Sequence, residues 1–168
     1  MCGIVGISSE THVASSIYES LLMLQHRGQD AAGMVVCDNE GRLHSRKSMG
    51  YVRDVFHQSH MNKLVGHYGI GHVRYPTAGG AGKEFAQPMY VNSPYGISLA
   101  HNGNLTNSKE LAIQLFHAEM RHLNTDSDSE VLLNIFAHEL GKQRQIYPKP
   151  EHMFKAVTKI SKRSAIIL

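Results

Sequence analysis

The chain opens with the run Met1-Cys2-Gly3-Ile4-Val5-Gly6-Ile7, and this stretch decides the fold. Its apolar part, residues 3–7, is rich in β-branched side chains and predicts a buried strand with Cys2 at its open end. Removal of Met1 would leave a thiol and a free α-amine on the same residue. The amine titrates at about 7.7 to 8.0 and a free thiol at about 8.5, so the amine can take the thiol proton and return it to a leaving group. The sequence therefore predicts a nucleophile and a base on one residue, held by a rigid element.

Length and composition limit the classes of protein. A chain of 168 residues with 42% hydrophobic and 18% charged residues suits one domain with a buried core. The net charge of +3 is scattered, which gives no support to nucleic-acid binding. Cys2 and Cys37 form neither a disulfide framework nor a zinc spacing, and this favours a reducing compartment. No stretch reaches the length of a membrane span and no secretion signal precedes Cys2, so we expect a cytoplasmic protein without a membrane partner.

The order of the predicted elements indicates the fold class. Apolar patterns predict strands over residues 3–7, 33–37, 42–46, 67–74, 89–91 and 97–101, and helices over 11–25, 107–120, 128–140 and 150–160, with short helical turns within 51–64. Because the strands come first and the helices cluster later, this order favours an α+β layered sandwich over an alternating parallel-sheet protein. The last five residues are apolar and predict either a terminal strand that pairs with the sheet or a domain cut short.

Three familiar ligand motifs are excluded by their spacing. Gly82 and Lys83 lack the flanking residues of a phosphate-binding loop. Residues 126–130 alternate acids like a calcium loop, but Val131 and Ala137 stand where its glycine and its bidentate glutamate belong. Of the twelve histidines, the close pairs lack a third ligand. The sequence predicts no metal site and no cofactor in this segment.

Five motifs remain, and they carry the chemistry. They are the start at residues 2–6, His-Arg-Gly-Gln-Asp-Ala-Ala-Gly at 26–33, Gly-His-Val-Arg-Tyr-Pro-Thr at 71–77, His-Asn-Gly-Asn-Leu at 101–105 and Thr-Asp-Ser-Asp-Ser-Glu at 125–130. Together they closely resemble the glutaminase domain of class II glutamine amidotransferases, from residue 1 to about residue 158. The resemblance implies an N-terminal-nucleophile hydrolase fold, an αββα sandwich, incomplete at its C-terminus.

Within the class, the sequence is most similar to the subfamily that opens purine synthesis. This rests on the stretch 90–107 and on His26 and Gln29, where the related glucosamine-6-phosphate synthases usually have tyrosines. A glutaminase domain of that relative is the alternative. The resemblance implies that complete members add a phosphoribosyltransferase domain that uses Mg²⁺, and that they are homo-oligomers. Residues 1–168 would then be a truncated glutaminase domain without that second domain.

The resemblance also implies roles for single residues. Cys2 would attack the amide carbon of L-glutamine, and the oxyanion would be held by the Asn102 side chain and the Gly103 N–H. Arg74 would bind the α-carboxylate through its planar fork, which lysine cannot reproduce. Asp128 would accept from the α-ammonium. Asp128 can also be read as a helix N-terminal charge, since Ser127 and Glu130 have capping-box spacing, and both interpretations can hold together.

Two further segments have supporting roles by resemblance. Arg27 and Gly28 would pack beside Cys2, where the arginine either favours the thiolate or serves as a structural ion-pair partner. Residues 77–83, beginning at Thr77, would form a lid over bound glutamine, or else a plain surface loop. The implied reaction yields glutamate and ammonia through a γ-glutamyl thioester. The rival hypothesis is a catalytically silent remnant that acts as an interaction module.

Overall fold

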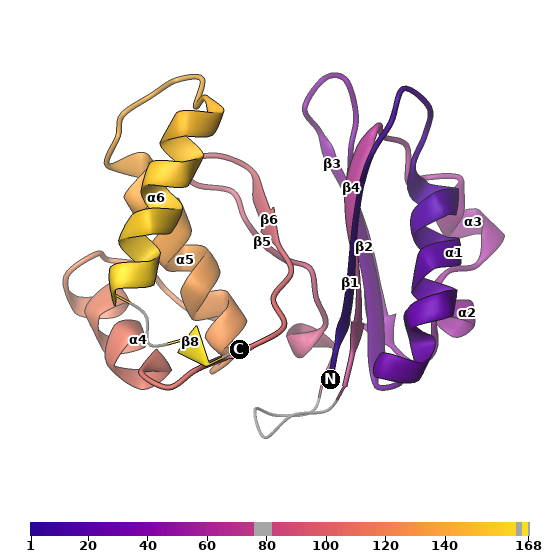
Figure 1. Cartoon of the computed structure of the whole chain (residues 1–168), viewed down its shortest axis with the longest axis horizontal. Coiled ribbons are helices and arrows are strands. Elements are labelled where there is room, and N and C mark those ends of the chain that lie inside the picture. The colour runs from indigo at the N-terminus through magenta and orange to yellow at the C-terminus, as the bar shows by residue number, and fades with distance from the viewer. Residues whose placement is uncertain (76–81, 164–165, 168) are drawn as a thin grey trace. The chain divides into compact units, whose positions relative to one another are not determined.

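The computed structural model of the protein describes residues 1–75, 82–163 and 166–167 (Figure 1). These residues fall into two compact units. The first comprises Met1–Met89 and Leu99–Asn102, and the second comprises Tyr90–Ser98 and Gly103–Leu168.

The first unit is built on a four-stranded antiparallel sheet in the order β1-β4-β2-β3. Its strands are β1 (Gly3–Ser8), β2 (Ala31–Cys37), β3 (Leu43–Met49) and β4 (Tyr68–Arg74). Helix α1 (Ala14–Leu24) packs on β1 and β4 and continues into the 3-10 turn η1 (Gln25–Arg27), while the short helices α2 (Val52–Val55) and α3 (Gln58–Met61) lie on the same side of the sheet (Figure 1). A second 3-10 turn, η2 (Lys83–Phe85), follows later in the chain.

The core of the first unit forms between α1 and the sheet. Ile17 and Leu21 from α1 are fully buried against strand residues such as Met34, Val36 and Val73. The helical period of the α1 side chains and the alternation in the strands put these residues on facing surfaces. Burial of each such side chain contributes about 1.5–3 kcal/mol relative to exposure, so this core fixes the strands whose ends carry the site.

The second unit is mainly helical. It contains α4 (Ser108–His117), α5 (Asp128–Gly141) and α6 (Pro150–Arg163), and α5 packs against both of the others (Figure 1). Helix α5 is buried along most of its length, whereas α6 buries Ala156 and Ile160 and exposes Phe154 and Val157. The hairpin of β5 (Met89–Val91) and β6 (Ile97–Leu99) enters this unit, with Met89 and Leu99 assigned to the first.

The predicted elements agree with the structure within a few residues, and the predicted α+β class is confirmed. Two features go beyond the prediction. Ile166–Ile167 forms a short strand, β8, which pairs with the unpredicted strand β7 (Asn104–Leu105). The two described residues of the apolar terminal run thus pair in a separate two-stranded sheet, not with the four-stranded one.

Candidate active site

The sheet register gathers the first group of predicted site residues at one end of the first unit. Gly3 of β1 lies opposite Val73 of β4, and Ala31 of β2 lies opposite Arg74. Extending each ladder by one residue places Cys2 opposite Arg74 and Asp30 opposite Tyr75. Residues far apart in the sequence thus meet because three strands end together.

Cys2 is buried, with 8% of its surface exposed, directly before β1. Its Sγ accepts the backbone N–H of Tyr75 at 3.4 Å. Its carbonyl oxygen accepts from Arg27 Nε at 3.0 Å and from Asn102 Nδ2 at 3.4 Å. The structure therefore brings Cys2, Arg27 and Asn102 together. Arg27 was expected either to favour the thiolate or to form a structural ion pair. Its side chain donates a hydrogen bond to the Cys2 backbone, and it forms no ion pair within the described residues.

Gly28 fits where no other residue would fit without a shift. A Cβ at this position would stand 2.6 Å from the carbonyl carbon of Arg74 and 2.7 Å from its oxygen. The Gly28 N–H donates to the Gln25 carbonyl at 3.2 Å, and Gln25 Nε2 donates back to the Gly28 carbonyl at 2.6 Å. This tight turn directs Arg27 toward Cys2, so the close approach at Gly28 is part of the site's construction.

Arg74 is held by groups that the sequence did not single out. Its side chain is 6% exposed, and Nη1 donates to Asp30 Oδ2 at 2.5 Å. The guanidinium carbon lies 5.5 Å from the centre of the Phe85 ring, and the Asp30 N–H donates to the Arg74 carbonyl at 3.0 Å. Asp30 belongs to the motif at 26–33, so its motif membership was a signal. Phe85 had none, because its contact depends on where η2 lies.

Asp128, the predicted ammonium ligand, lies in the second unit in the first turn of α5. Its Oδ2 accepts the Leu105 N–H at 3.1 Å, and its Oδ1 accepts from Ser129 Oγ at 3.3 Å. Gly103 also belongs to the second unit and is exposed. The ligand role of Asp128 and the oxyanion role of Gly103 stay predictions.

The start of α5 differs from the predicted capping box. Ser127 does cap the helix, since its side chain accepts from the Ser129 N–H at 3.3 Å. The Glu130 side chain does not accept the Ser127 N–H, although the Glu130 N–H donates to the Ser127 carbonyl at 3.1 Å. Its carboxylate instead accepts the N–H groups of Asn124 at 2.9 Å and Thr125 at 2.8 Å. The N–H groups of this loop have no helical partner, and the buried Glu130 carboxylate accepts from them instead of completing the box.

Thr77 and the lid residues up to 81 lie outside the described residues. The last two positions of that segment, Gly82 and Lys83, are described and lead into η2. The lid remains a prediction.

His72 is a buried histidine in β4, fully removed from solvent. Burial is the main reason that the pKa of His72 falls to about 4. The polar backbone of His101 raises this pKa, and the electrostatic influence of Arg74 and of the His101 ring lowers it further. His72 is therefore neutral near pH 7. A neutral ring at this place avoids a second buried positive charge close to Arg74.

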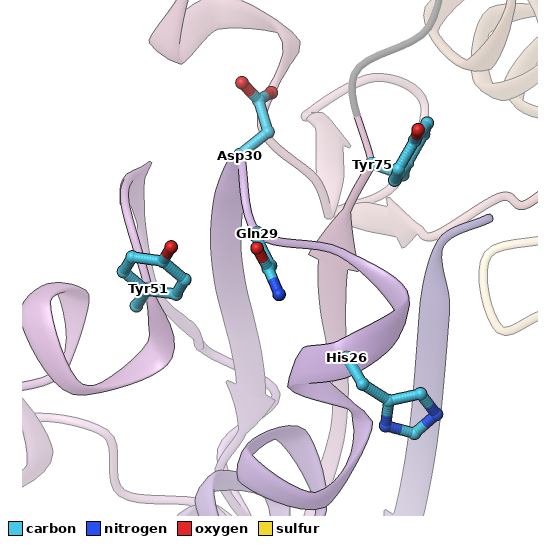
Figure 2. A pocket seen from close by; sticks show the side chains of 5 residues that line it. All are labelled: His26, Gln29, Asp30, Tyr51 and Tyr75. Carbon is cyan, nitrogen blue, oxygen red and sulfur yellow. The ribbon is translucent and has the colours of Figure 1, made fainter.

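A cavity of about 440 Å³ opens beside Asp30 in the first unit. It is lined by His26, Gln29, Asp30, Tyr51 and Tyr75, and Figure 2 shows Gln29 and Asp30 projecting from the segment before β2, with the two tyrosines on either side. Within the described part of the chain, no three His, Cys, Asp or Glu side chains are grouped to hold a metal ion. No described helix has the length and apolarity to cross a bilayer.

Comparison with known protein families agrees with the fold and with the grouping of residues around Cys2. Residues 60–167, more than half of the chain, match the family model described as a glutamine amidotransferase domain. The chain belongs to this family, and the predicted class is confirmed. Its similarity to curated relatives is more specific. It is 56% identical to the amidophosphoribosyltransferase of Pseudomonas aeruginosa, over 97% of this chain and 32% of the relative.

Other relatives point the same way. Identity is 56% to the amidophosphoribosyltransferase of Escherichia coli and 51% to that of Saccharomyces cerevisiae, each over 94% of this chain and 31% of the relative. The chain thus spans about a third of the length of these relatives.

Two solved structures share the fold. One is described as the allosteric regulatory enzyme of purine biosynthesis, with a TM-score of 0.79 and 32% identity, over 98% of this chain and 33% of that one. The other is glutamine phosphoribosylpyrophosphate amidotransferase from B. subtilis, with a TM-score of 0.78 and 30% identity, over 99% and 33%. This likeness confirms the N-terminal-nucleophile hydrolase fold.

Proposed function

We propose that this chain hydrolyses L-glutamine to glutamate and ammonia through a γ-glutamyl thioester on Cys2, as the ammonia-supplying part of an amidophosphoribosyltransferase in purine biosynthesis. The observation that carries the proposal is the arrangement at Cys2. Its buried sulfur faces the Tyr75 N–H, while Arg27 and the Asn102 amide both reach its carbonyl. A nucleophile held at a strand end with amide donors around it suits acyl transfer.

The first half of the reaction forms the thioester. With Met1 removed, the Cys2 α-amine takes the thiol proton, and the thiolate attacks the amide carbon of glutamine. The Tyr75 N–H supports the negative sulfur before attack, because hydrogen bonds to charged acceptors are stronger than neutral ones. The Asn102 amide and the Gly103 N–H hold the oxyanion. The carbon–nitrogen bond then breaks, and the α-ammonium gives its proton to the departing ammonia.

The second half releases glutamate. Water attacks the thioester carbon and the α-amine takes one of its protons. The carbon–sulfur bond breaks, the sulfur regains a proton from the α-ammonium, and glutamate leaves. The same amine and the same oxyanion donors thus serve both steps.

Recognition of glutamine requires separate partners for its two backbone charges. Arg74, a buried cation at the strand end opposite Cys2, suits the α-carboxylate. Asp128 is assigned to the α-ammonium. The proposal predicts that Arg74 and Asp128 each contribute to glutamine binding.

The fate of ammonia follows from the relatives' names. We assign its transfer to a phosphoribosyltransferase part of the kind that those names describe, since the chain matches only about a third of their length. A cytoplasmic site of action is proposed because a catalytic thiol needs a reducing compartment.

The test is glutamate release from glutamine by the purified chain, beside a Cys2→Ala variant. We expect release that depends on Cys2 and on loss of Met1, which mass spectrometry of the N-terminus measures. Equal rates from the two samples would contradict the proposal and leave the chain as the silent interaction module.

A further inference from the structure

We propose that Asp30 and Phe85 are positioning residues that fix the guanidinium of Arg74, and that they thereby set the preference of the site for a ligand with an α-carboxylate. This inference rests on the proposed function, because it concerns how that site recognises glutamine. It concerns the first unit alone.

The geometry fixes Arg74 at three points. Asp30 Oδ2 accepts from Arg74 Nη1 at 2.5 Å, the Phe85 ring centre lies 5.5 Å from the guanidinium carbon, and the Arg74 carbonyl accepts the Asp30 N–H at 3.0 Å. The side chains of Arg74 and Asp30 are only 6% and 18% exposed. The guanidinium is therefore largely shielded from competing water, and the carboxylate and the ring both restrain it.

Orientation matters for this cation because of what it is proposed to bind. A guanidinium discriminates for carboxylates through two parallel N–H groups in one plane, and a plane rotated away offers only one of them. An arginine side chain also has many rotamers, and freezing them at the moment of binding weakens affinity. A side chain fixed beforehand avoids that loss.

The position of Asp30 gives it this role without contact to the reaction centre. It directly precedes β2, and the ladder places it opposite Tyr75, the residue whose N–H faces the Cys2 sulfur. Figure 2 shows its carboxylate projecting from that strand end. Asp30 thus lies beside Arg74 at the strand end, where its carboxylate orients the cation.

The experiment measures ligand selectivity instead of activity. The full chain carrying Cys2→Ala cannot form a thioester, so titration calorimetry gives dissociation constants for L-glutamine and for L-glutaminamide, in which an amide replaces the α-carboxylate. The ratio of the two constants reports the carboxylate interaction alone. A general loss of structure would weaken both ligands alike and leave the ratio unchanged.

Four variants in the Cys2→Ala background test the Asp30 carboxylate and the Phe85 ring separately. We expect Asp30→Ala to weaken glutamine by about tenfold, which corresponds to about 1.4 kcal/mol, and to leave glutaminamide unchanged. Asp30→Asn keeps an acceptor for Nη1 and keeps most of the ratio. Phe85→Leu, which removes the ring face, lowers the ratio by about threefold, whereas Phe85→Tyr keeps it. If Asp30→Ala does not fold, the Asp30→Asn and Phe85 variants still give the result.

Glu40→Gln is the matched control. It removes a carboxylate of the same unit that pairs with Arg42 at 3.5 Å on the exposed turn at the other end of β2, and it should not change the ratio. The inference is overturned if Asp30→Ala and Phe85→Leu leave the ratio at the unsubstituted value, or if the unsubstituted chain does not prefer glutamine over glutaminamide. Failure of the proposed function looks different: glutamine binds with this selectivity, but no Cys2-dependent glutamate appears.

Discussion

Two arginine clusters, one in each unit, show how the same ion-pair chemistry serves different ends. In the first unit, Arg74 pairs with the carboxylate of Asp30 at a sheet end that also holds Cys2. In the second, Arg163 at the end of α6 pairs with both Glu119, after α4, and Glu139, within α5. The first cluster orients one cation beside a nucleophile, and the second fastens three helical segments together.

The neighbours of each cluster explain the difference. Glu139 also pairs with Lys142 at 2.9 Å and Lys159 at 3.6 Å, so several cations share its carboxylate. Arg74 has Asp30 and a ring face instead. A network of shared charges resists helix separation, whereas the Asp30 carboxylate and an aromatic ring together resist rotation of the Arg74 guanidinium. The comparison therefore predicts catalytic and recognition effects for changes in the first cluster and its surroundings, and stability effects alone for the second.

The largest expected effect is on turnover, from Asn102→Ala in the first unit. Loss of an oxyanion donor should lower kcat by about 10²–10³-fold, or about 2.7–4 kcal/mol in the chemical step, with little change in KM. Steady-state glutamate release measures this. Asn62→Ala, on the exposed end of α3, is the control and should match the unsubstituted chain. If kcat falls by less than tenfold, Asn102 is not a donor to the oxyanion.

The next effect is the acid sensitivity of the first unit, which His72 should dominate. Its pKa is about 4 in the folded chain, against about 6.5 when unfolded, mainly because of burial. Above pH 6.5 the His72 ring is mostly neutral in both the folded and the unfolded chain, so His72 does not lower the free energy of unfolding there. As the pH falls from 6.5 to 4, His72 becomes protonated in the unfolded chain but stays mostly neutral in the folded chain. The free energy of unfolding therefore falls by about 3 kcal/mol.

Denaturant unfolding at pH 7.5, 5.5 and 4.5 tests this. His72→Gln should flatten the loss, although its stability at pH 7.5 is lower, while His117→Gln, at an exposed position of α4, should keep the full pH dependence. The same pH slope in the chain and in His72→Gln would show that another group is responsible.

The sequence predicted the elements well because their signals are local. The β-branched run after Cys2, the helical spacing from Val13 to Leu24 and the turn between β2 and β3 all depend on neighbouring residues. The grouping of Cys2, Arg27 and Asn102 came from resemblance to a family. Its physical cause is the ladder of β1 and β2 on β4, which no spacing along the chain contains.

What escaped prediction depends on distant partners. Glu130 carries the local signal of a capping box, yet its carboxylate binds the loop before the helix. Arg163 reads as a terminal basic residue, but it pairs with carboxylates 44 and 24 residues away. Phe85 carries no motif at all. In each case a tertiary contact outweighs, or is invisible to, the local pattern.

A smaller effect is expected from the close approach that shapes the Arg27 turn. Gly28→Ala would force a methyl group against the Arg74 backbone, which cannot move without disturbing β4. We expect the free energy of unfolding to fall by about 1–3 kcal/mol, and glutaminase activity to fall with it as Arg27 shifts. Gly6→Ala is the control, since its nearest neighbour is 3.9 Å away. Equal stability of the two variants would show that the turn absorbs the methyl group.

The smallest effect should come from Glu139→Gln in the second cluster. Burial raises the Glu139 pKa, but the hydrogen bond and charge of Lys142, with Lys159 and Arg163, outweigh burial and lower it overall. A lowered pKa means that this stabilisation is present above the unfolded value of about 4.3 and is lost as the pH falls through the folded value. The cations stay partly hydrated, so we expect a loss of about 1–2 kcal/mol at pH 7.

Thermal unfolding at pH 7 and at pH 3.5 measures this change. Glu40→Gln, which removes an exposed ion pair, is the control and should leave the stability at both pH values unchanged. The difference between Glu139→Gln and the unsubstituted chain should shrink at pH 3.5, where both side chains approach neutrality. Because this cluster fastens helices and orients no ligand, the glutamine to glutaminamide ratio should stay unchanged in Glu139→Gln. A shift in that ratio would mean that the two clusters are energetically coupled. It would then be wrong that the first cluster alone affects ligand recognition and the second alone stabilises helix packing.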